Sequence, residues 1–255
     1  MDSGKSNEHC AMEISISKSW QELGQKAAAL AIDRLKDAIT QKGCARILLA
    51  TGMSQMETMR RLADSDVDWS NVEVFHMDEY IGLPPGHKAS FIKYIQERFI
   101  DKVKVKKFYP VETKDDLNEN LKQLSAAIRE SPVDVGMIGI GENTHIGFND
   151  PPADFETREA YIQVKLDDRC KLQQVGEGWF ASIDEVPDAA VTITPYQTLQ
   201  CQTIICSVPY LVKADAIYKT ITSKISEDIP STILKKHDDF HLFLDRDSAS
   251  RIIQF

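Results

Sequence analysis

Side chains able to carry acid–base chemistry gather in one short stretch of the chain, between Gly139 and Pro151. Eight residues of this stretch, 143–150, hold an imidazole, a carboxylate and two carboxamides, at Asn143, His145, Asn149 and Asp150. Histidine changes charge near neutral pH, which suits it to proton transfer there. A neighbouring carboxylate can hold the tautomer of an imidazole and stabilise its cation. The stretch therefore predicts an acid–base site, and the alternative is a glycine-rich turn whose polar groups satisfy one another.

A loop of small residues between an apolar strand and a helix predicts an anion site. The strand covers 45–50, the helix runs through Leu62, and Thr51, Gly52, Met53 and Ser54 separate them. Main-chain N–H groups and the helix dipole both favour an anion at such a position. The spacing is not that of a P-loop, and the P-loop lysine is absent. The alternative, in which Ser54 only caps the helix, stays open.

Two adjacent carboxylates, Asp78 and Glu79, follow a predicted strand at 72–76. On local grounds such a pair can equally be a solvated turn. In a doubly wound sheet, however, the loops after the strands all lie along one edge, where ligands bind. The anion loop, Asp78 and the group around His145 can therefore converge. Together they suit proton transfer on a sugar phosphate, in which one group holds the phosphate, one opens the ring and one moves the proton.

Strand and helix patterns alternate along all 255 residues, which predicts a single α/β domain with a mostly parallel sheet. Residues 1–12 are polar and are expected to be flexible. Strands are predicted at 45–50, 72–76, 108–110, 133–138, 161–166, 190–194, 203–208 and 240–244. Helices are predicted from Ser17 or Ser19 to about 41, and at 54–62, 90–99, 115–130, 167–175, from about 210, and at 231–236.

Composition narrows the class of function. A formal net charge of −9 argues against nonspecific binding to nucleic acid or to anionic membranes. The chain has no run of about 18 apolar residues and no signal-peptide pattern. Its five cysteines form no CxxC pair, which favours free thiols in the cytoplasm. No cluster of histidine, cysteine and aspartate has metal-ligand spacing, so we expect neither a metal nor a cofactor.

At these residues the chain resembles a known family, the isomerising glucosamine-6-phosphate deaminases, which share one sugar-phosphate superfamily with the 6-phosphogluconolactonases. The resemblance covers about 47 to 237 and rests on 51–54, 75–80, 82–84, His87, 90–91 and above all 141–151. It implies a modified Rossmann-like fold, with helices on both faces of the sheet. It also implies that glucosamine 6-phosphate and water are converted into fructose 6-phosphate and ammonia.

The resemblance implies a role for each matching residue. Asp78 matches the base that moves a proton between C2 and C1, and His145 matches the imidazole that opens the sugar ring. Asp150 and Asn143 would orient that imidazole. The residues expected to bind the substrate and its phosphate are Thr51, Gly52, Met53, Ser54, Glu79 and Lys213.

Several positions depart from the family pattern. Asn143-Thr144-His145 stands where Asp-Gly-His is usual, and Asp150 replaces a glutamate that is one methylene longer. Met53 occupies the place of a second glycine in the phosphate loop. Gln174 aligns with a phosphate-binding arginine, although Arg169 and Lys171 are close in sequence. The regulatory arginine and lysine of hexameric members find no match at 158–163, so we expect no such regulation.

Three interpretations of function stay open. The first is an active deaminase with a rearranged triad. The second is a related enzyme on another sugar phosphate, either an isomerase that releases no ammonia or a lactonase. Lactonases typically have Asp-Glu-Arg where this chain has Asp78-Glu79-Tyr80. The third is a non-catalytic paralogue that binds a sugar phosphate. The sequence does not decide the oligomeric state, and a homo-oligomer is compatible with it.

Overall fold

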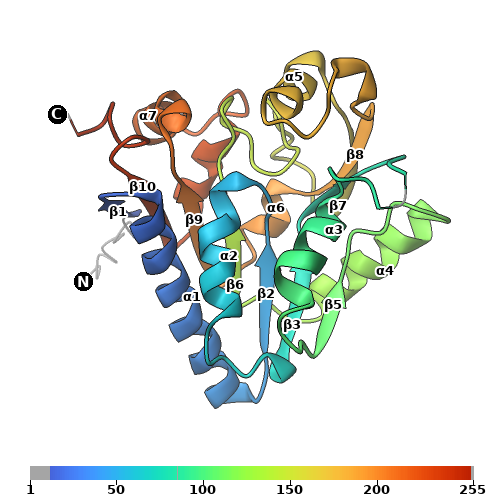
Figure 1. The fold of residues 1–255 in the computed structure, drawn as a ribbon, viewed down its shortest axis with the longest axis vertical. Helices are drawn as coiled ribbons and strands as arrows, with labels where there is room; N and C mark the ends of the chain where they lie inside the picture. The colour runs from blue at the N-terminus through green and yellow to red at the C-terminus, as the bar shows by residue number, and fades with distance from the viewer. Residues whose placement is uncertain (1–11, 85, 254–255) are drawn as a thin grey trace, which may run out of the picture.

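A seven-stranded parallel sheet forms the centre of the computed structural model, which describes residues 12–84 and 86–253 (Figure 1). Its strands, in spatial order, are β1 (Glu13–Ser17), β10 (Phe240–Asp245), β9 (Thr203–Val208), β6 (Val135–Ile138), β2 (Ala45–Leu49), β3 (Val72–His76) and β5 (Lys107–Tyr109). Every neighbouring pair runs in parallel. The prediction of a mostly parallel α/β sheet is thus confirmed.

Helices cover both faces of this sheet because its central strands are apolar on both sides. In β2, Ile47 and Leu49 face one layer and Leu48 faces the other, as the alternation of strand side chains requires. The first layer contains α1 (Trp20–Lys42), α2 (Met56–Ala63) and α3 (Phe91–Ile95), which a π-helical turn extends over Gln96–Ile100. The second contains α4 (Leu117–Arg129) and α7 (Ala214–Thr222).

Shorter helical segments connect the layers. The α-helices among them are α5 (Asp168–Gly176) and α6 (Pro195–Thr198). The 3₁₀ segments are η1 (Met53–Gln55), η2 (Trp69–Asn71), η4 (Ile183–Glu185), η5 (Leu211–Lys213) and η6 (Pro230–Lys236). In the part of the chain that is described, no helix combines the length and the apolar character needed to cross a bilayer.

A second, three-stranded antiparallel sheet lies beside the first and was not predicted as such. It consists of β4 (Asp78–Tyr80), β8 (Ala189–Ile193) and β7 (Tyr161–Lys165). The sequence pattern indicated β7 and β8 as strands but placed 78–80 after the strand that ends at His76, without a strand of their own. Only Met77 separates β3 from β4. A single residue carries no pattern that marks a change of sheet, which is why the sequence did not reveal this one.

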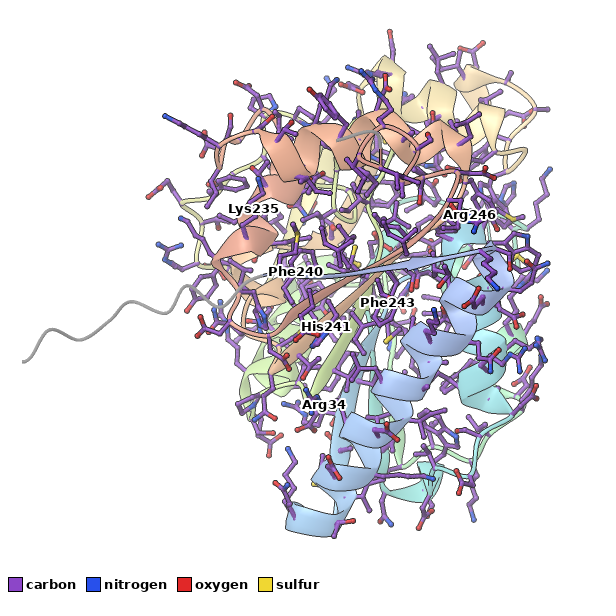
Figure 2. All side chains as sticks on the ribbon, turned by 90° about the vertical axis from the view of Figure 1, so that its left-hand side faces the viewer. Arg34, Lys235, Phe240, His241, Phe243 and Arg246 are labelled. Carbon is purple, nitrogen blue, oxygen red and sulfur yellow. The ribbon has the colours of Figure 1, made fainter. Side chains whose placement is uncertain are left out.

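The edge strand β1 also escaped prediction. Residues 1–11 lie outside the described residues, but Met12, which was expected to be flexible, packs against the core. One imidazole contact ties β1 to the sheet: Nδ1 of His241 on β10, labelled in Figure 2, lies 3.0 Å from the carboxylate of Glu13. The other ring nitrogen, Nε2, lies 2.7 Å from the carboxylate of Asp239, just before β10. Arg34 of α1 approaches the same Asp239 carboxylate at 3.5 Å.

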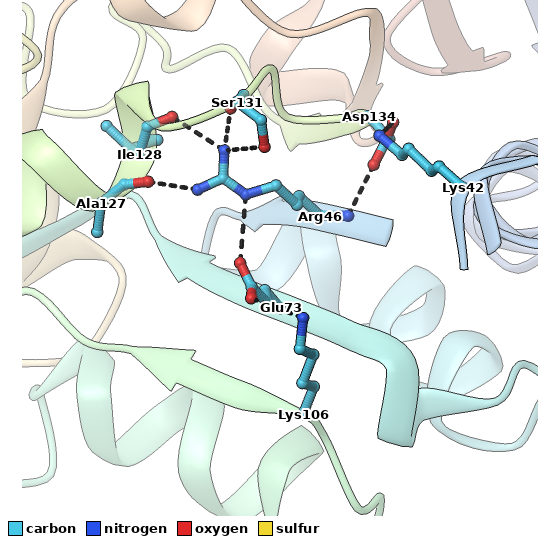
Figure 3. Close-up of polar contacts among 8 residues, drawn as sticks. All are labelled: Lys42, Arg46, Glu73, Lys106, Ala127, Ile128, Ser131 and Asp134. Atoms are coloured by element: carbon cyan, nitrogen blue, oxygen red, sulfur yellow. Dashed lines mark hydrogen bonds and ion pairs between the residues drawn. The ribbon is translucent and has the colours of Figure 1, made fainter. Parts of the chain in front are cut away.

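A buried guanidinium stabilises the amino-terminal edge of the sheet (Figure 3). Arg46 of β2 is buried and donates to the carbonyl oxygens of Ala127, Ile128 and Ser131 at the end of α4. Its Nε lies 3.3 Å from a carboxylate oxygen of Glu73. Five donors on a rigid plane allow one arginine to satisfy all these acceptors. This interaction joins α4, β2 and β3 at the end of the sheet opposite the loops discussed below.

Replacing Arg46 by methionine should therefore destabilise the fold. Methionine keeps the apolar stem but leaves three carbonyl oxygens without their donor, so we expect the free energy of unfolding to fall by roughly 3 kcal/mol or more. Urea denaturation measures this change. The matched control is Arg34→Met, at a half-exposed pair, which should cost less than about 1 kcal/mol. Equal losses in the two variants would contradict the structural role of Arg46.

Candidate functional site

The loops that follow β2, β3, β6 and β9 converge on one cavity of about 790 Å³. Residues of α5 and η5 contribute to its lining, and α5 lies at the upper end of the molecule in Figure 1. Most residues proposed from the sequence line it: Thr51, Gly52, Met53, Ser54, Asp78, Asn143, His145 and Lys213. Asp150 and Glu79 are not among the lining residues. The structure thus brings together side chains that are far apart in the sequence.

His145 and Asp150 form the central pair of the site. Nδ1 of the imidazole lies 3.2 Å from Oδ1 of Asp150, and both side chains are largely buried. Burial alone would raise the pKa of Asp150, but His145, the amide of Asn143 and the thiol of Cys170 outweigh it and hold the pKa below its usual value. Asp150 therefore carries the negative charge that a protonated imidazole needs. With Nδ1 facing Asp150, Nε2 is the nitrogen left for a substrate.

Asn143 acts on the imidazole indirectly. Its Nδ2 donates to Oδ1 of Asp150 at 2.8 Å, and its Oδ1 accepts from the backbone N–H of His145 at 3.2 Å. The sequence analysis expected Asn143 to orient the imidazole together with Asp150. In the structure, Asn143 holds the carboxylate and the backbone of His145 rather than the ring.

Close packing and strain fix the position of the imidazole. A Cβ atom at Gly141 would lie 2.1 Å from two atoms of the His145 ring, so only glycine fits there. The intervening Thr144 has a φ of 74°, a conformation that β-branched residues rarely adopt. Its carbonyl accepts from the N–H of Ser231 on η6 at 2.9 Å, which holds the strained turn from outside.

Asp78 supplies a second carboxylate, on β4 opposite Thr192 of β8. Its side chain is 6% exposed and lines the cavity. Burial, and then the charge of Glu79, raises the pKa of Asp78 to about 8. Asp78 thus retains its proton near neutral pH. A carboxyl group with such a pKa is suited to exchange protons with a ligand.

Glu79 points away from the cavity, unlike its neighbour. Its carboxylate accepts from the hydroxyl of Ser90 at 2.7 Å and from the N–H groups of Ile92 and Tyr80 at 2.9 Å. These bonds place Glu79 at the amino-terminal end of α3, where the helix dipole favours a negative charge. Its position does not support the predicted contact with substrate, and its influence on the site is the charge that it places beside Asp78.

The anion loop presents backbone N–H groups to the cavity. Gly52, with a φ of 99°, begins η1, and no side chain caps this segment, so Ser54 is not its cap. The first N–H groups of a helix have no partner within it. Two side chains secure the loop: Tyr94 donates to the carbonyl of Gly52 at 2.9 Å, and Gln55 donates to the carbonyls of Ile138 and Ser207.

Positive charge reaches the cavity from two directions. Lys213 on η5 is 7% exposed, and the structure gives its ammonium no carboxylate within ion-pair distance among the described residues. Burial lowers its pKa, against the charges of Glu177 and Glu142. Arg169 of α5 also lines the cavity. Because buried charges in proteins are normally paired, a buried ammonium group without an ion-pair partner indicates a site for a bound anion.

The structure also shows which cation of α5 lines the cavity. Gln174 lines it too, and its Oε1 accepts from the hydroxyl of Tyr80 at 2.7 Å, but its uncharged side chain supplies no positive charge in place of the family's arginine. Lys171 forms an ion pair with Asp188 and does not line the cavity. Arg169 is therefore the cation that α5 contributes.

Sequence reasoning did not identify several residues that shape the site. Gly141 packs under the imidazole, Tyr94 anchors the anion loop, and Tyr210 lines the cavity beside Lys213. Gly141 lay within the glycine-rich stretch, but nothing in the spacing separates a packing glycine from a turn glycine. In residues 12–84 and 86–253, no three histidine, cysteine or acidic side chains are grouped so as to hold a metal ion.

The raised pKa of Asp78 predicts how stability depends on pH. The unfolded chain loses this proton near pH 3.8, and the folded chain keeps it to about pH 8. Between these values the folded state binds more protons, so its stability falls as the pH rises. Asp78→Asn removes this effect, and at pH 8 it should exceed the wild type in free energy of unfolding by about 2 kcal/mol or more.

Urea denaturation from pH 5 to pH 8 checks this expectation. The matched control is Asp228→Asn, at an exposed carboxylate, which should follow the wild-type curve. Parallel curves for Asp78→Asn and the wild type would show that burial of Asp78 does not perturb its ionisation.

Comparison with known proteins places this site in a family. Residues 18–242 match the model of glucosamine-6-phosphate isomerases/6-phosphogluconolactonase. The glucosamine-6-phosphate deaminase of Streptococcus suis (strain 05ZYH33) is 30% identical over 230 residues, covering 89% of this chain and 96% of that protein. The deaminase of Clostridium botulinum (strain Eklund 17B / Type B) is 30% identical over 247 residues, covering 94% of this chain and 96% of that protein.

Solved structures of the same superfamily also superpose on this chain. A monomeric glucosamine-6-phosphate deaminase superposes with a TM-score of 0.85 at 30% identity, covering 94% of this chain and 100% of that one. The 6-phosphogluconolactonase of Thermotoga maritima reaches a TM-score of 0.76 at 13% identity, covering 92% and 100%, which shows a shared fold alone. The chain belongs to the family of glucosamine-6-phosphate isomerases and 6-phosphogluconolactonases.

Proposed function

We propose that this protein is an enzyme that converts glucosamine 6-phosphate and water into fructose 6-phosphate and ammonia. The observation that carries the proposal is the convergence of three groups on one cavity: the His145–Asp150 pair, the buried carboxyl group of Asp78, and an anion site at the loop 51–54 and Lys213. The names of the relatives that are about 30% identical support the same reaction.

His145 is proposed to open the sugar ring. Its Nε2 would pass a proton to the ring oxygen while Asp150 stabilises the imidazolium from the other side of the ring. Asn143 stands where the family usually has an aspartate, but its amide holds Asp150 in place. The charge needed by the imidazolium therefore comes from Asp150 alone. This is the rearranged triad of the proposal.

Asp78 is proposed to move a proton from C2 to C1 of the open chain. That step needs its ionised form, which the positive charge of the substrate's amino group would favour. A carboxylate whose pKa is about 8 is a stronger base than an exposed one. The resulting C2 imine then reacts with water and releases ammonia.

The phosphate is proposed to bind at the other end of the cavity. The N–H groups at the start of η1 and the hydroxyl of Ser54 would donate to its oxygens, and Lys213 and Arg169 would supply opposite charge. Glu142 and Glu177 line the cavity as well, and they limit the positive potential there. Both cations are therefore needed to bind a dianion.

The decisive experiment measures ammonia release together with fructose 6-phosphate formation from glucosamine 6-phosphate. Relative to the wild type, His145→Ala and Asp78→Asn should each lower kcat by about 10²- to 10⁴-fold, because each removes a proton-transfer group. Glucosamine 6-phosphate should still raise the melting temperature of both variants. The matched control is His237→Ala, at an imidazole that does not line the cavity, which should keep kcat within about twofold.

Two outcomes would count against this function. Fructose 6-phosphate formation without ammonia, from a substrate that lacks the amino group, would identify an isomerase instead. No turnover in the wild type, with a melting temperature still raised by sugar phosphate, would favour a binding protein.

The two basic residues of α5 provide a test of the phosphate site. Arg169→Met should raise KM for glucosamine 6-phosphate by about three- to tenfold with kcat nearly unchanged, because Arg169 lines the cavity but is exposed. Lys171→Met, two residues away, is the matched control, because Lys171 pairs with Asp188 outside the cavity. Steady-state kinetics distinguishes the two. A larger effect at Lys171 would refute this orientation of α5.

A further inference from the structure

Tyr210 has a backbone conformation that few residues other than glycine adopt. Its φ is 81° and its ψ is 145°. A side chain in this region is strained, and the strain persists only where the surrounding structure enforces it. Tyr210 lies between β9 and η5, three residues before Lys213, and it lines the cavity. Strained residues cluster at functional sites, which makes Tyr210 a candidate for a role in binding.

A buried carboxylate enforces the conformation of Tyr210. Asp245, at the end of β10, accepts from the backbone N–H of Tyr210 with both oxygens, at 3.2 and 3.0 Å. Asp245 is itself buried and accepts from the N–H of Ser248 at 2.8 Å. The buried carboxylate of Asp245 therefore holds the backbone of Tyr210 against the end of β10.

The phenol ring of Tyr210 lies 6.4 Å from the indole ring of Trp20, measured between centroids, and its hydroxyl reaches the anion loop. Its hydroxyl lies 3.5 Å from the carbonyl oxygen of Met53, at the upper limit of a hydrogen bond. The hydroxyl is thus held next to the anion loop but is only weakly engaged. A ligand oxygen with a negative charge would be a better acceptor than this carbonyl.

Two other tyrosines close to the cavity are engaged differently. The hydroxyl of Tyr94 donates to Gly52 at 2.9 Å, and that of Tyr80 donates to Gln174 at 2.7 Å. Both are buried, and neither lines the cavity. Their hydroxyl groups hold the walls of the site together, whereas that of Tyr210 is available to a ligand.

We propose that Tyr210 binds the substrate directly by donating a hydrogen bond from its hydroxyl group to a phosphate oxygen. This donor completes the phosphate end of the cavity from the η5 side, where it offsets the absence of an arginine at the position of Gln174. The inference rests on the proposed function only in placing a phosphate at this end, and it is independent of the chemistry at Asp78 and His145.

Inorganic phosphate is the probe that separates this inference from the deaminase reaction. Isothermal titration calorimetry at low ionic strength should show that Tyr210→Phe, which loses only the hydroxyl, binds phosphate about five- to tenfold more weakly than the wild type. KM for glucosamine 6-phosphate should rise by a similar factor while kcat stays within about twofold. The matched control is Tyr196→Phe, at a tyrosine that does not line the cavity.

A second variant tests the strain. Glycine adopts the backbone conformation of Tyr210 without strain. Tyr210→Gly should therefore keep a melting temperature at least equal to that of the wild type, and it should bind phosphate no better than Tyr210→Phe.

Wild-type affinity in Tyr210→Phe would overturn the proposal and leave the deaminase function intact. Weaker phosphate binding by Tyr210→Phe in a protein that releases no ammonia would uphold the proposal without that function. A wild type that binds no phosphate would overturn the proposal, and ammonia release would still decide the deaminase function.

Discussion

The contact between the loop around His145 and the small antiparallel sheet determines the geometry of the site. The N–H of Phe148 donates to the hydroxyl of Thr192 at 3.0 Å, and the amide of Asn149 donates to the carbonyl of Ile193 at 2.8 Å. Thr192 pairs with Asp78 across the sheet. The loop that carries the imidazole is therefore fastened to the strand that holds the second carboxyl group in place.

The close contact between the loop around His145 and the small sheet requires a glycine at 147. A Cβ atom at Gly147 would lie 2.6 Å from the hydroxyl oxygen of Thr192 and 3.1 Å from Oδ2 of Asp78, and its φ of 58° also favours glycine. The backbone thus covers Asp78 directly, and this cover contributes to the burial that raises its pKa. The close approach of Gly147 is thus one contribution to the burial of Asp78, beside the pairing with Thr192 that positions it and the charge of Glu79 that also raises its pKa.

Several features of the site work against the stability of the fold. Asp78 and Lys213 are buried ionisable groups, and Thr144 and Tyr210 have strained backbones. Such features persist because the rest of the structure enforces them. Here the enforcing contacts come from Ser231 on η6 and Asp245 on β10. At the other end of the sheet, the hydrogen bonds and the ion pair of Arg46 stabilise the fold and have no contact with the cavity. The strained and buried polar groups are therefore at one end of the sheet, and this stabilising interaction is at the other.

Sequence patterns predicted what regular periodicity and residue type encode. The parallel strands other than β1, the helix from Ser19 to the turn at Gly43, and the convergence of the acid–base loop with the anion loop all followed from them. The switch of sheet at Met77 did not, because one residue has no period. Nor did the different directions of Asp78 and Glu79, although neighbouring strand residues must face opposite sides. Which of Arg169, Lys171 and Gln174 supplies positive charge to the cavity depends on the orientation of α5, and tertiary contacts determine that orientation.

The amide at Asn143 is best understood through the atom that it contacts. Its Nδ2 and the imidazole of His145 approach the same oxygen, Oδ1 of Asp150, at 2.8 and 3.2 Å. An aspartate at 143 in this geometry would bring two carboxylates into contact, and one of them would have to take up a proton. The amide instead donates to Asp150 and helps to keep its pKa low. In this chain the acid at 150 and the amide at 143 are therefore complementary: the neutral donor at 143 holds a single carboxylate beside the imidazole of His145. The amide leaves one carboxylate at this imidazole, and it helps to lower the pKa of that carboxylate.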